Sequence, residues 1–433
     1  MTAFDRFDPF ERRITDAIDE IAAERPPTYL TDILRQTARV SQRPRWTFPE
    51  RWLPVDTTLP RAGFARVPIR PLLLMTLLAA ALAAVLGLYL GSQNRVAPPF
   101  GLAANGLIAY PANGDLLVRE ALTGEPRLFI GGDGDQSSGD FSPNGEYLTY
   151  LTSKADGYHL MFAKADGSNS HELALIPKSG NAAAAWAPDS QRVALISDVK
   201  LVPTLSILAL GADSQVVPLP DLVPLDVTWS PPDGKLLLVR ARLAGTEETD
   251  LYTVRPDGTE LTRLNLPGHS SYGPTLTLSG STWSPSGQSI AFNSIIDDPG
   301  SSADAYFRTS LVNPDGSNVR MLPPVQDGSL FSQAWPIYSP DGKWIVMESW
   351  YSQPDGAAIN QLAIAPADGS TAARGIGPRV PGQSLVKAWS PDGTKLLLSV
   401  RDVGTLYAID PTSGVAELLP YTGELPAWQR RAP

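Results

Sequence analysis

Trp389 to Leu398 read Trp-Ser-Pro-Asp-Gly-Thr-Lys-Leu-Leu-Leu, and variants of this phrase occur six times between residues 141 and 398. Every copy has an aromatic residue, a small residue, proline, a polar turn and then a hydrophobic run. The other five copies begin at Phe141, Trp186, Trp229, Trp283 and Tyr338. Self-similarity at a period of roughly 40–50 residues predicts a repeat architecture, in which every unit has the same fold.

Each repeat contains four short segments with the composition of β-strands. The first segment follows the Ser-Pro turn, as in Arg192–Ile196, and Leu251–Val254 is an example of the second. In four units a hairpin turn then leads to a third segment, and these turns are Asp166-Gly167, Asp257-Gly258, Asp315-Gly316 and Asp368-Gly369. Asp-Gly between apolar runs is a strong hairpin signal, because glycine accepts the positive φ of the turn. We expect the fourth strand to end at the next aromatic residue. Four strands per unit predict the blades of a β-propeller.

The number of blades depends on both ends of the repeat region. Gly106–Tyr110, Asp115–Arg119 and Pro126–Ile130 form a first unit without an aromatic-Ser-Pro phrase before it, and Trp428 closes a last unit. The chain therefore predicts an all-β, seven-bladed propeller over residues 103–430, with six blades as the alternative if an end unit is incomplete. We expect the N- and C-terminal strands to meet in one sheet, which closes the ring and leaves only short edges.

The composition excludes several classes of site. The 433 residues include no cysteine, which excludes disulfides, thiolate metal sites and cysteine nucleophiles, and the three histidines lack any metal-ligand spacing. Residues 1–70 carry 12 Arg, no Lys and 10 acids, whereas the rest carries 23 Lys and Arg against 35 acids. An acidic repeat region disfavours nucleic acid as a partner, because phosphate binding needs clustered lysine and arginine. No cofactor is expected.

The segment Pro71–Leu90 is a run of twenty residues without a charge. As a helix it is about 30 Å long, the thickness of a bilayer's hydrocarbon core, so we expect a transmembrane helix over 71–90. Four arginines precede this run, and only Arg95 lies close behind it. The positive-inside rule then predicts a cytoplasmic N-terminus, a linker over 91–102 and an exterior propeller. A buried core helix and a cleaved signal peptide are the weaker alternatives.

The expected cytoplasmic segment, residues 1–60, contains two short predicted helices. Asp8 is an N-cap before Pro9 at the first helical position, and Thr28 caps a second helix with apolar residues at helical spacing. Two helices of this size bury too little apolar surface to be stable alone. They therefore need a partner protein, a second copy of the chain or the membrane surface.

The repeated phrase resembles the WD40-like propeller repeat of the TolB family, in which Trp-Ser-Pro-Asp-Gly-Lys precedes a hydrophobic strand. The resemblance covers roughly residues 103–430 and implies a scaffold that binds proteins or other ligands, without a catalytic residue. The order of leader, span and propeller is more weakly similar to transmembrane anti-sigma factors. The His/Cys zinc pattern of the commonest anti-sigma domains is missing from this chain.

The repeated aromatic residues and turn aspartates are interpreted as parts of the blades. Tryptophans at one position per blade bury large areas and are expected to pack between blades. Several aspartates stand in turns, where side-chain-to-backbone hydrogen bonds are common; these are Asp189, Asp233, Asp341 and Asp392.

The acidic loop Gly131–Asp140 offers Asp133, Asp135 and Asp140 as possible calcium ligands. It lacks the glycine and glutamate spacing of an EF-hand loop. A solvated connection between two blades is therefore the favoured interpretation, and no metal site is expected.

Two longer loops, 266–281 and 295–305, remain as places for a ligand, since rigid scaffolds carry function on loops. We take His269, Tyr272, Asp297 and Asp298 as candidate binding residues, with surface loops that bind nothing as the alternative. An enzyme is not expected. The Gly-x-Ser-x-Gly elbow and the roughly 200 further residues of a propeller-bearing serine peptidase are missing from this sequence.

These features together predict a non-enzymatic, single-pass bacterial membrane protein whose exterior propeller binds a protein, peptide or glycan. Residues 1–60 are expected to contact a cytoplasmic regulatory protein or to anchor the chain. An envelope scaffold of TolB type and an anti-sigma-type regulator are the alternatives.

Overall fold

The computed structural model describes residues 100–432, except 138, 179–181, 201, 247–248, 265, 267–280, 297–305, 382–384, 401–402 and 424–425. The expected cytoplasmic helices, the transmembrane helix over 71–90 and most of the linker lie outside the described residues. Among the residues that are described, no helix has the length and apolarity needed to cross a bilayer.

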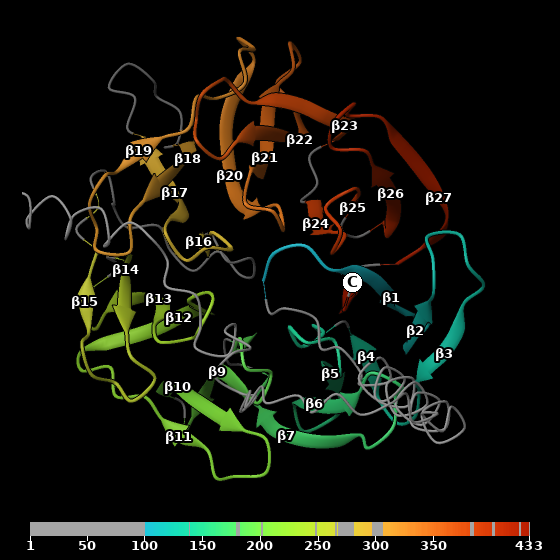
Figure 1. Cartoon of the computed structure of the whole chain (residues 1–433), viewed down its shortest axis with the longest axis vertical. Helices are drawn as coiled ribbons and strands as arrows, with labels where there is room; N and C mark the ends of the chain where they lie inside the picture. Colours follow the sequence, from blue (N-terminus) through green and yellow to red (C-terminus); the bar gives the residue numbers. More distant parts are fainter. Residues whose placement is uncertain are drawn as a thin grey trace, which may run out of the picture. The chain divides into compact units, whose positions relative to one another are not determined.

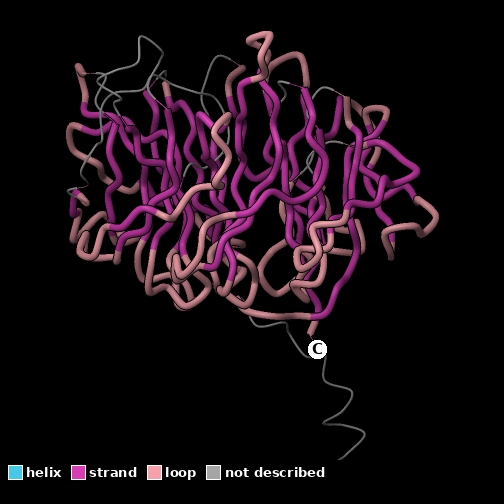
Figure 2. Tube along the Cα trace, turned by 90° about the horizontal axis from the view of Figure 1, so that it is seen from above, coloured by secondary structure: helices cyan, strands magenta, loops and turns pink. Residues whose placement is uncertain are grey.

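The described residues form seven antiparallel sheets of four strands each, arranged as blades around a central axis (Figure 1). The all-β, seven-bladed propeller expected from the sequence is therefore confirmed. Figure 2 shows that the strands run side by side between two opposite faces, where the turns and loops gather.

The blades are numbered here in chain order. Blade 1 contains β28 (Ala427–Arg431), β1 (Ala104–Ala112), β2 (Asp115–Arg119) and β3 (Arg127–Ile130). Blade 2 contains β4 (Asp135–Ser137), β5 (Tyr147–Ser153), β6 (Tyr158–Lys164) and β7 (His171–Ile176). Blade 3 contains β8 (Ala183–Trp186), β9 (Arg192–Val199), β10 (Val202–Ala209) and β11 (Gln215–Val216). Blade 4 contains β12 (Leu222–Trp229), β13 (Leu237–Leu243), β14 (Thr249–Val254) and β15 (Thr262–Arg263).

The remaining three blades repeat this order. Blade 5 contains β16 (Ser281–Trp283), β17 (Ile290–Ile296), β18 (Tyr306–Val312) and β19 (Arg320–Met321). Blade 6 contains β20 (Leu330–Tyr338), β21 (Trp344–Ser352), β22 (Ala358–Pro366) and β23 (Arg374–Pro381). Blade 7 contains β24 (Leu385–Trp389), β25 (Leu396–Val400), β26 (Thr405–Ile409) and β27 (Ala416–Thr422). In Figure 1 the last strand of each of these blades, such as β19 and β27, lies at the rim.

The division of the chain into blades differs from the expectation in one respect. The strand that ends at each repeated aromatic is the first strand of its own blade, not the fourth strand of the preceding unit. For example, β12 ends at Trp229, which pairs with Leu237 of β13 in the same sheet. The reason is the shortness of the Ser-Pro turn, because a tight turn joins antiparallel neighbours and cannot reach another blade. We call the face with these turns the turn face, and the opposite face, where the first strands begin, the loop face.

The two ends of the described chain meet in blade 1, as expected. β28 pairs with β1 in antiparallel register, with Ala104 opposite Arg431 and Ala109 opposite Ala427. The C-terminal strand thus takes the place of the first strand that the N-terminal unit lacks. This pairing closes the ring through a continuous sheet and covers the inner edge of β1.

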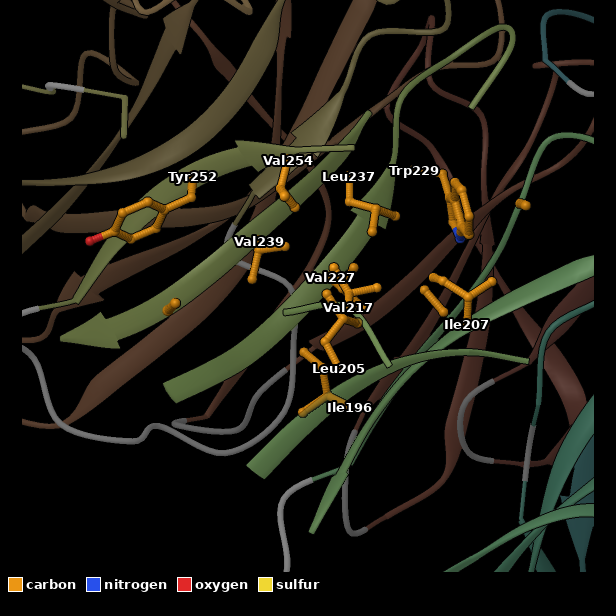
Figure 3. Packing of buried hydrophobic residues seen from close by; sticks show 13 residues of the cluster. Ile196, Leu205, Ile207, Val217, Val227, Trp229, Leu237, Val239, Tyr252 and Val254 are labelled. Carbon is orange, nitrogen blue, oxygen red and sulfur yellow. The ribbon is translucent and has the colours of Figure 1, made fainter. Parts of the chain in front are cut away.

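The hydrophobic core lies between neighbouring blades, and one cluster illustrates it (Figure 3). Ile196, Leu205 and Ile207 of blade 3 pack against Val227 and Val239 of blade 4 in this cluster. Similar clusters lie between other pairs of blades, for example between Val346 of blade 6 and Leu398 of blade 7. Burial of about 25 cal/mol per Å² of apolar surface makes these contacts the main stabilising term of the propeller.

The repeated tryptophans belong to this packing, which confirms their interpretation as blade-building residues. Trp186, Trp229 and Trp283 are at most 9% exposed. The indole Nε1 of Trp186 donates to the backbone carbonyl of Asp140 in blade 2, at 3.0 Å. Trp229 makes the corresponding bond to the carbonyl of Ala185 in blade 3, at 3.0 Å. Each of these two indoles therefore ties its own blade to the preceding one.

Candidate functional site

The four binding residues expected from the sequence, His269, Tyr272, Asp297 and Asp298, lie outside the described residues. His269 and Tyr272 follow β15 of blade 4 and precede β16 of blade 5, and Asp297 and Asp298 lie between β17 and β18 of blade 5. β16 begins at Ser281, and β17 ends at Ile296, opposite Tyr306 of β18. Because β16 begins and β17 ends at the same edge of the sheet, both segments join the blade at the loop face.

The turn aspartates stabilise the Ser-Pro turns, as expected. Asp392 Oδ1 accepts hydrogen bonds from the Ser390 hydroxyl at 2.6 Å and from the backbone N–H of Thr394 at 3.0 Å. Burial opposes ionisation of this carboxyl, but these hydrogen bonds outweigh it and hold the pKa of Asp392 below its usual value. Asp341 makes the same two bonds in its own turn, to Ser339 and Lys343. The aspartates are thus occupied within the turns.

The acidic loop 131–140 lies between β3 of blade 1 and β5 of blade 2 and contains β4. In the part of the chain that the structure describes, no three His, Asp or Glu side chains are arranged so that they could hold a metal ion. Asp135 begins β4, and Asp133 lies in the preceding connection from blade 1. These positions agree with a connection between blades 1 and 2. The same loop also lines a cavity between these two blades.

An aromatic pair in blade 6 is a functional candidate that sequence patterns did not indicate. The rings of Trp335 on β20 and Trp350 on β21 contact each other edge to face, with centroids 4.8 Å apart. Both side chains are partly exposed. Trp335 has a φ of +54°, which is a rare conformation for a bulky residue within a strand. The β20–β21 register shifts between Ala334 and Ile337, so Trp335 forms a β-bulge.

The bulge depends on a contact with the neighbouring blade. The backbone N–H of Trp335 donates to Oδ1 of Asn293 on β17, at 2.8 Å. Bulges of this kind redirect a side chain, and strained backbone often occurs at functional positions. The positive φ thus places the Trp335 indole against Trp350 at a cost in local conformational energy of order 1–3 kcal/mol.

Buried polar residues stand near this pair in the sequence of the same two strands, β20 and β21. Gln333 is 2% exposed, and its Nε2 donates to the hydroxyl of Ser349 at 2.9 Å. Its Oε1 accepts a hydrogen bond from the backbone of Val325 at 3.3 Å. Glu348, opposite Ala334, is fully buried. The Gln333 side chain thus links β20 to β21 at Ser349, the residue before Trp350.

A second unusual group lies in blade 4. Asp226 on β12 is directly opposite Arg240 on β13. Asp226 Oδ2 and Arg240 Nε are buried atoms without a hydrogen-bond partner. Burial raises the pKa of Asp226 to about 6, although Arg240 and the backbone N–H of Val227 act in the opposite direction. This carboxyl therefore changes its charge close to physiological pH.

No protein-family model and no curated protein matches the chain. Solved structures do match it. TolB from Acinetobacter baumannii is 18% identical, with 76% of this chain and 81% of that chain covered and a TM-score of 0.46. Oligogalacturonate lyase from Vibrio parahaemolyticus is 14% identical, with 76% and 86% covered and a TM-score of 0.47. A prolyl endopeptidase is 16% identical with a TM-score of 0.51, and the match covers 75% of this chain but 52% of that one. At these identities the similarity concerns the propeller fold alone.

Proposed function

We propose that this chain is a non-enzymatic, single-pass membrane protein whose propeller binds a protein, peptide or glycan outside the membrane. The Trp335–Trp350 pair is the observation that supports binding by the propeller. Partly exposed aromatic rings held by a rigid scaffold are frequent anchors for apolar side chains and for sugar rings. The charge-free run 71–90 and the arginines before it support the membrane anchor.

The binding proposal is tested with the full chain in detergent micelles, screened on peptide and glycan arrays. We expect Trp335→Ala and Trp350→Ala to lose at least about tenfold in affinity for the ligand that the wild type retains. Trp344→Ala is the matched control, because Trp344 is a tryptophan of the same strand as Trp350, at its turn-face end and 38% exposed. A wild-type chain that retains no array ligand, or retention that is equal in all variants, would contradict the proposal.

A signalling role is a second candidate, supported by the predicted helices of residues 1–60, whose apolar faces need a partner. The more specific form of the signalling proposal takes a sigma factor as this partner. The alternative to signalling is that the chain is an envelope scaffold. A chain without residues 1–60 that keeps the span distinguishes the two. The signalling role predicts loss of a specific cytoplasmic partner from the purified complex, whereas a scaffold keeps all its partners.

A further inference from the structure

A cavity of about 330 Å³ lies between blades 1 and 2, and its lining extends from the loop after β3 to the turn between β6 and β7. Phe129 and Ile130, at the end of β3, form one apolar wall, and Met161 of β6 faces them from blade 2. The size is at the lower end of the range of small-molecule sites in proteins. The cavity is separate from the aromatic pair of blade 6, because it is built from other blades.

Two residues of opposite charge line this cavity. They are Asp133, in the loop after β3, and Lys154, directly after β5. Both residues are exposed. Within the described residues, neither side chain forms an ion pair or a hydrogen bond. An anion and a cation that face one cavity and do not pair with each other are complementary to a ligand that carries both charges.

The wall of the cavity also contains an unsatisfied amide. Gln136 of β4 is 6% exposed and lines the cavity. Its backbone N–H is bonded to the carbonyl of Gly114 at 2.8 Å, but its side-chain Oε1 has no hydrogen-bond partner. Thr152 lies directly opposite on β5 and lines the same cavity. A buried amide oxygen without a partner costs about 1–3 kcal/mol, which a hydrogen-bond donor on a ligand would offset.

The loop that carries Asp133 is held against β5 by close backbone contact. Gly134 has a φ of +94°, and a Cβ at this position would lie 2.6 Å from the backbone carbonyl of Ser153. Any side chain here would therefore push the loop away from the end of β5. Glycine therefore allows the loop that carries Asp133 to lie against the end of β5, which Lys154 follows directly.

We propose that this inter-blade cavity binds a small zwitterion of the α-amino acid class. Its carboxylate pairs with Lys154 and its ammonium group pairs with Asp133. A side chain that ends in a hydrogen-bond donor reaches Gln136 between the apolar walls of Phe129 and Met161. The loop 131–140 thus has a role in binding that does not require a metal ion.

The test is isothermal titration calorimetry of the full chain in detergent micelles, with L-glutamine as the probe. L-Norleucine is compared because it has a side chain of similar length without a donor, and D-glucose because it is neutral. We expect L-glutamine to bind more tightly than L-norleucine, and D-glucose not to bind. Lys154→Met and Asp133→Asn should each weaken L-glutamine binding by about tenfold, the value of one charge-assisted hydrogen bond.

Lys343→Met is the matched control, because this exposed lysine lies in the Ser-Pro turn of blade 6 and does not line the cavity. Thermal unfolding of each variant checks that the propeller is intact, and we expect it to be, since the exchanged side chains are exposed. Absence of L-glutamine binding to the wild type overturns the proposal, as does binding that neither Lys154→Met nor Asp133→Asn weakens. Binding of D-glucose with the same sensitivity to these variants also overturns it. Trp335→Ala should leave L-glutamine binding unchanged, so failure here is distinct from failure of the proposed macromolecular site.

Discussion

Gln429, on the last strand, accepts a hydrogen bond through Oε1 from the backbone N–H of Leu107, on the first strand, at 3.0 Å. Its Nε2 donates to the backbone carbonyl of Gly145, in the Ser-Pro turn of blade 2, at 2.7 Å. The side chain is 6% exposed. One buried amide thus joins the two ends of the propeller and the next blade.

Replacing this amide should weaken the closure of the ring. We expect Gln429→Ala to lower the free energy of unfolding by about 2–3 kcal/mol, because it leaves buried partners of both hydrogen bonds unsatisfied. Urea denaturation of the full chain in detergent, followed by tryptophan fluorescence, measures the change. Gln288→Ala is the control, since Gln288 is exposed in a turn of blade 5. Equal midpoints for the two variants would show that Gln429 does not contribute to closure.

The serine of the repeated phrase should contribute to stability in every blade that has it. Ser390 Oγ accepts from the backbone N–H of Lys395 at 2.9 Å and donates to Asp392 at 2.6 Å. Ser339 makes the equivalent bonds to Trp344 and Asp341. We expect Ser390→Ala and Ser339→Ala each to cost about 1–2 kcal/mol in the free energy of unfolding, measured by urea denaturation.

The second copy of the phrase supplies an internal comparison for these variants. It has Ala187 where the others have serine, and its turn still forms through the backbone bond from Ser190 to Ala187 at 2.9 Å. The turn therefore tolerates alanine, and the variants should fold. A loss of less than about 0.5 kcal/mol would mean that the serine hydroxyl is dispensable in these two copies.

The repeated phrase was sufficient to predict the architecture, because its parts act locally. The serine and aspartate bond within one turn, and the tryptophan fills the gap to the adjacent blade, so every copy carries the same information. The closure of the ring was predictable for a related reason: the first unit lacked a strand that the residues around Trp428 could supply. The assignment of the strand before each aromatic was wrong, since the phrase alone does not show that its turn is too short to leave a sheet.

The aromatic pair of blade 6 could not be predicted in this way. Nothing in the sequence around Trp335 differs from an ordinary strand, and the bulge depends on Asn293, which is 42 residues away on another blade. The same holds for the cavity between blades 1 and 2. Asp133 was apparent as a possible ligand, but Lys154 and Gln136 become its neighbours only when β4 and β5 pair.

Asp226 should make the stability of the propeller depend on pH. Burial raises its pKa to about 6, above the ordinary value of 3.8, so the folded chain holds this proton more tightly than the unfolded chain. The contribution of this proton to the free energy of unfolding is fully present below about pH 4 and is lost as the pH rises through 6. Asp226→Asn removes this titration. We expect the free energy of unfolding of the variant to increase relative to that of the wild type as the pH rises from 4 to 8, by up to about 3 kcal/mol.

The measurement is the difference between the unfolding free energies of wild type and Asp226→Asn across this range. Hydrogen bonds to Asp156 and Glu172 raise the pKa of His159 above its usual value, despite its burial. It is present in both chains, so its contribution cancels in the difference. A difference that is constant from pH 4 to pH 8 would show that Asp226 does not titrate in this range in the folded chain.

The absence of cysteine allows a direct test of how the chain is oriented in a membrane. A single cysteine replaces either Ser370, which is exposed in the turn between β22 and β23, or Ala17, in the expected cytoplasmic segment. Spheroplasts that express each variant are treated with a membrane-impermeant maleimide before or after permeabilisation. If the arginines before residue 71 keep the N-terminus inside, Ser370→Cys reacts in intact spheroplasts and Ala17→Cys reacts only after permeabilisation. The cysteine-free wild type sets the background. Labelling of both positions in intact spheroplasts, or the reverse pattern, would exclude the orientation in which the propeller meets its ligand outside the cell membrane.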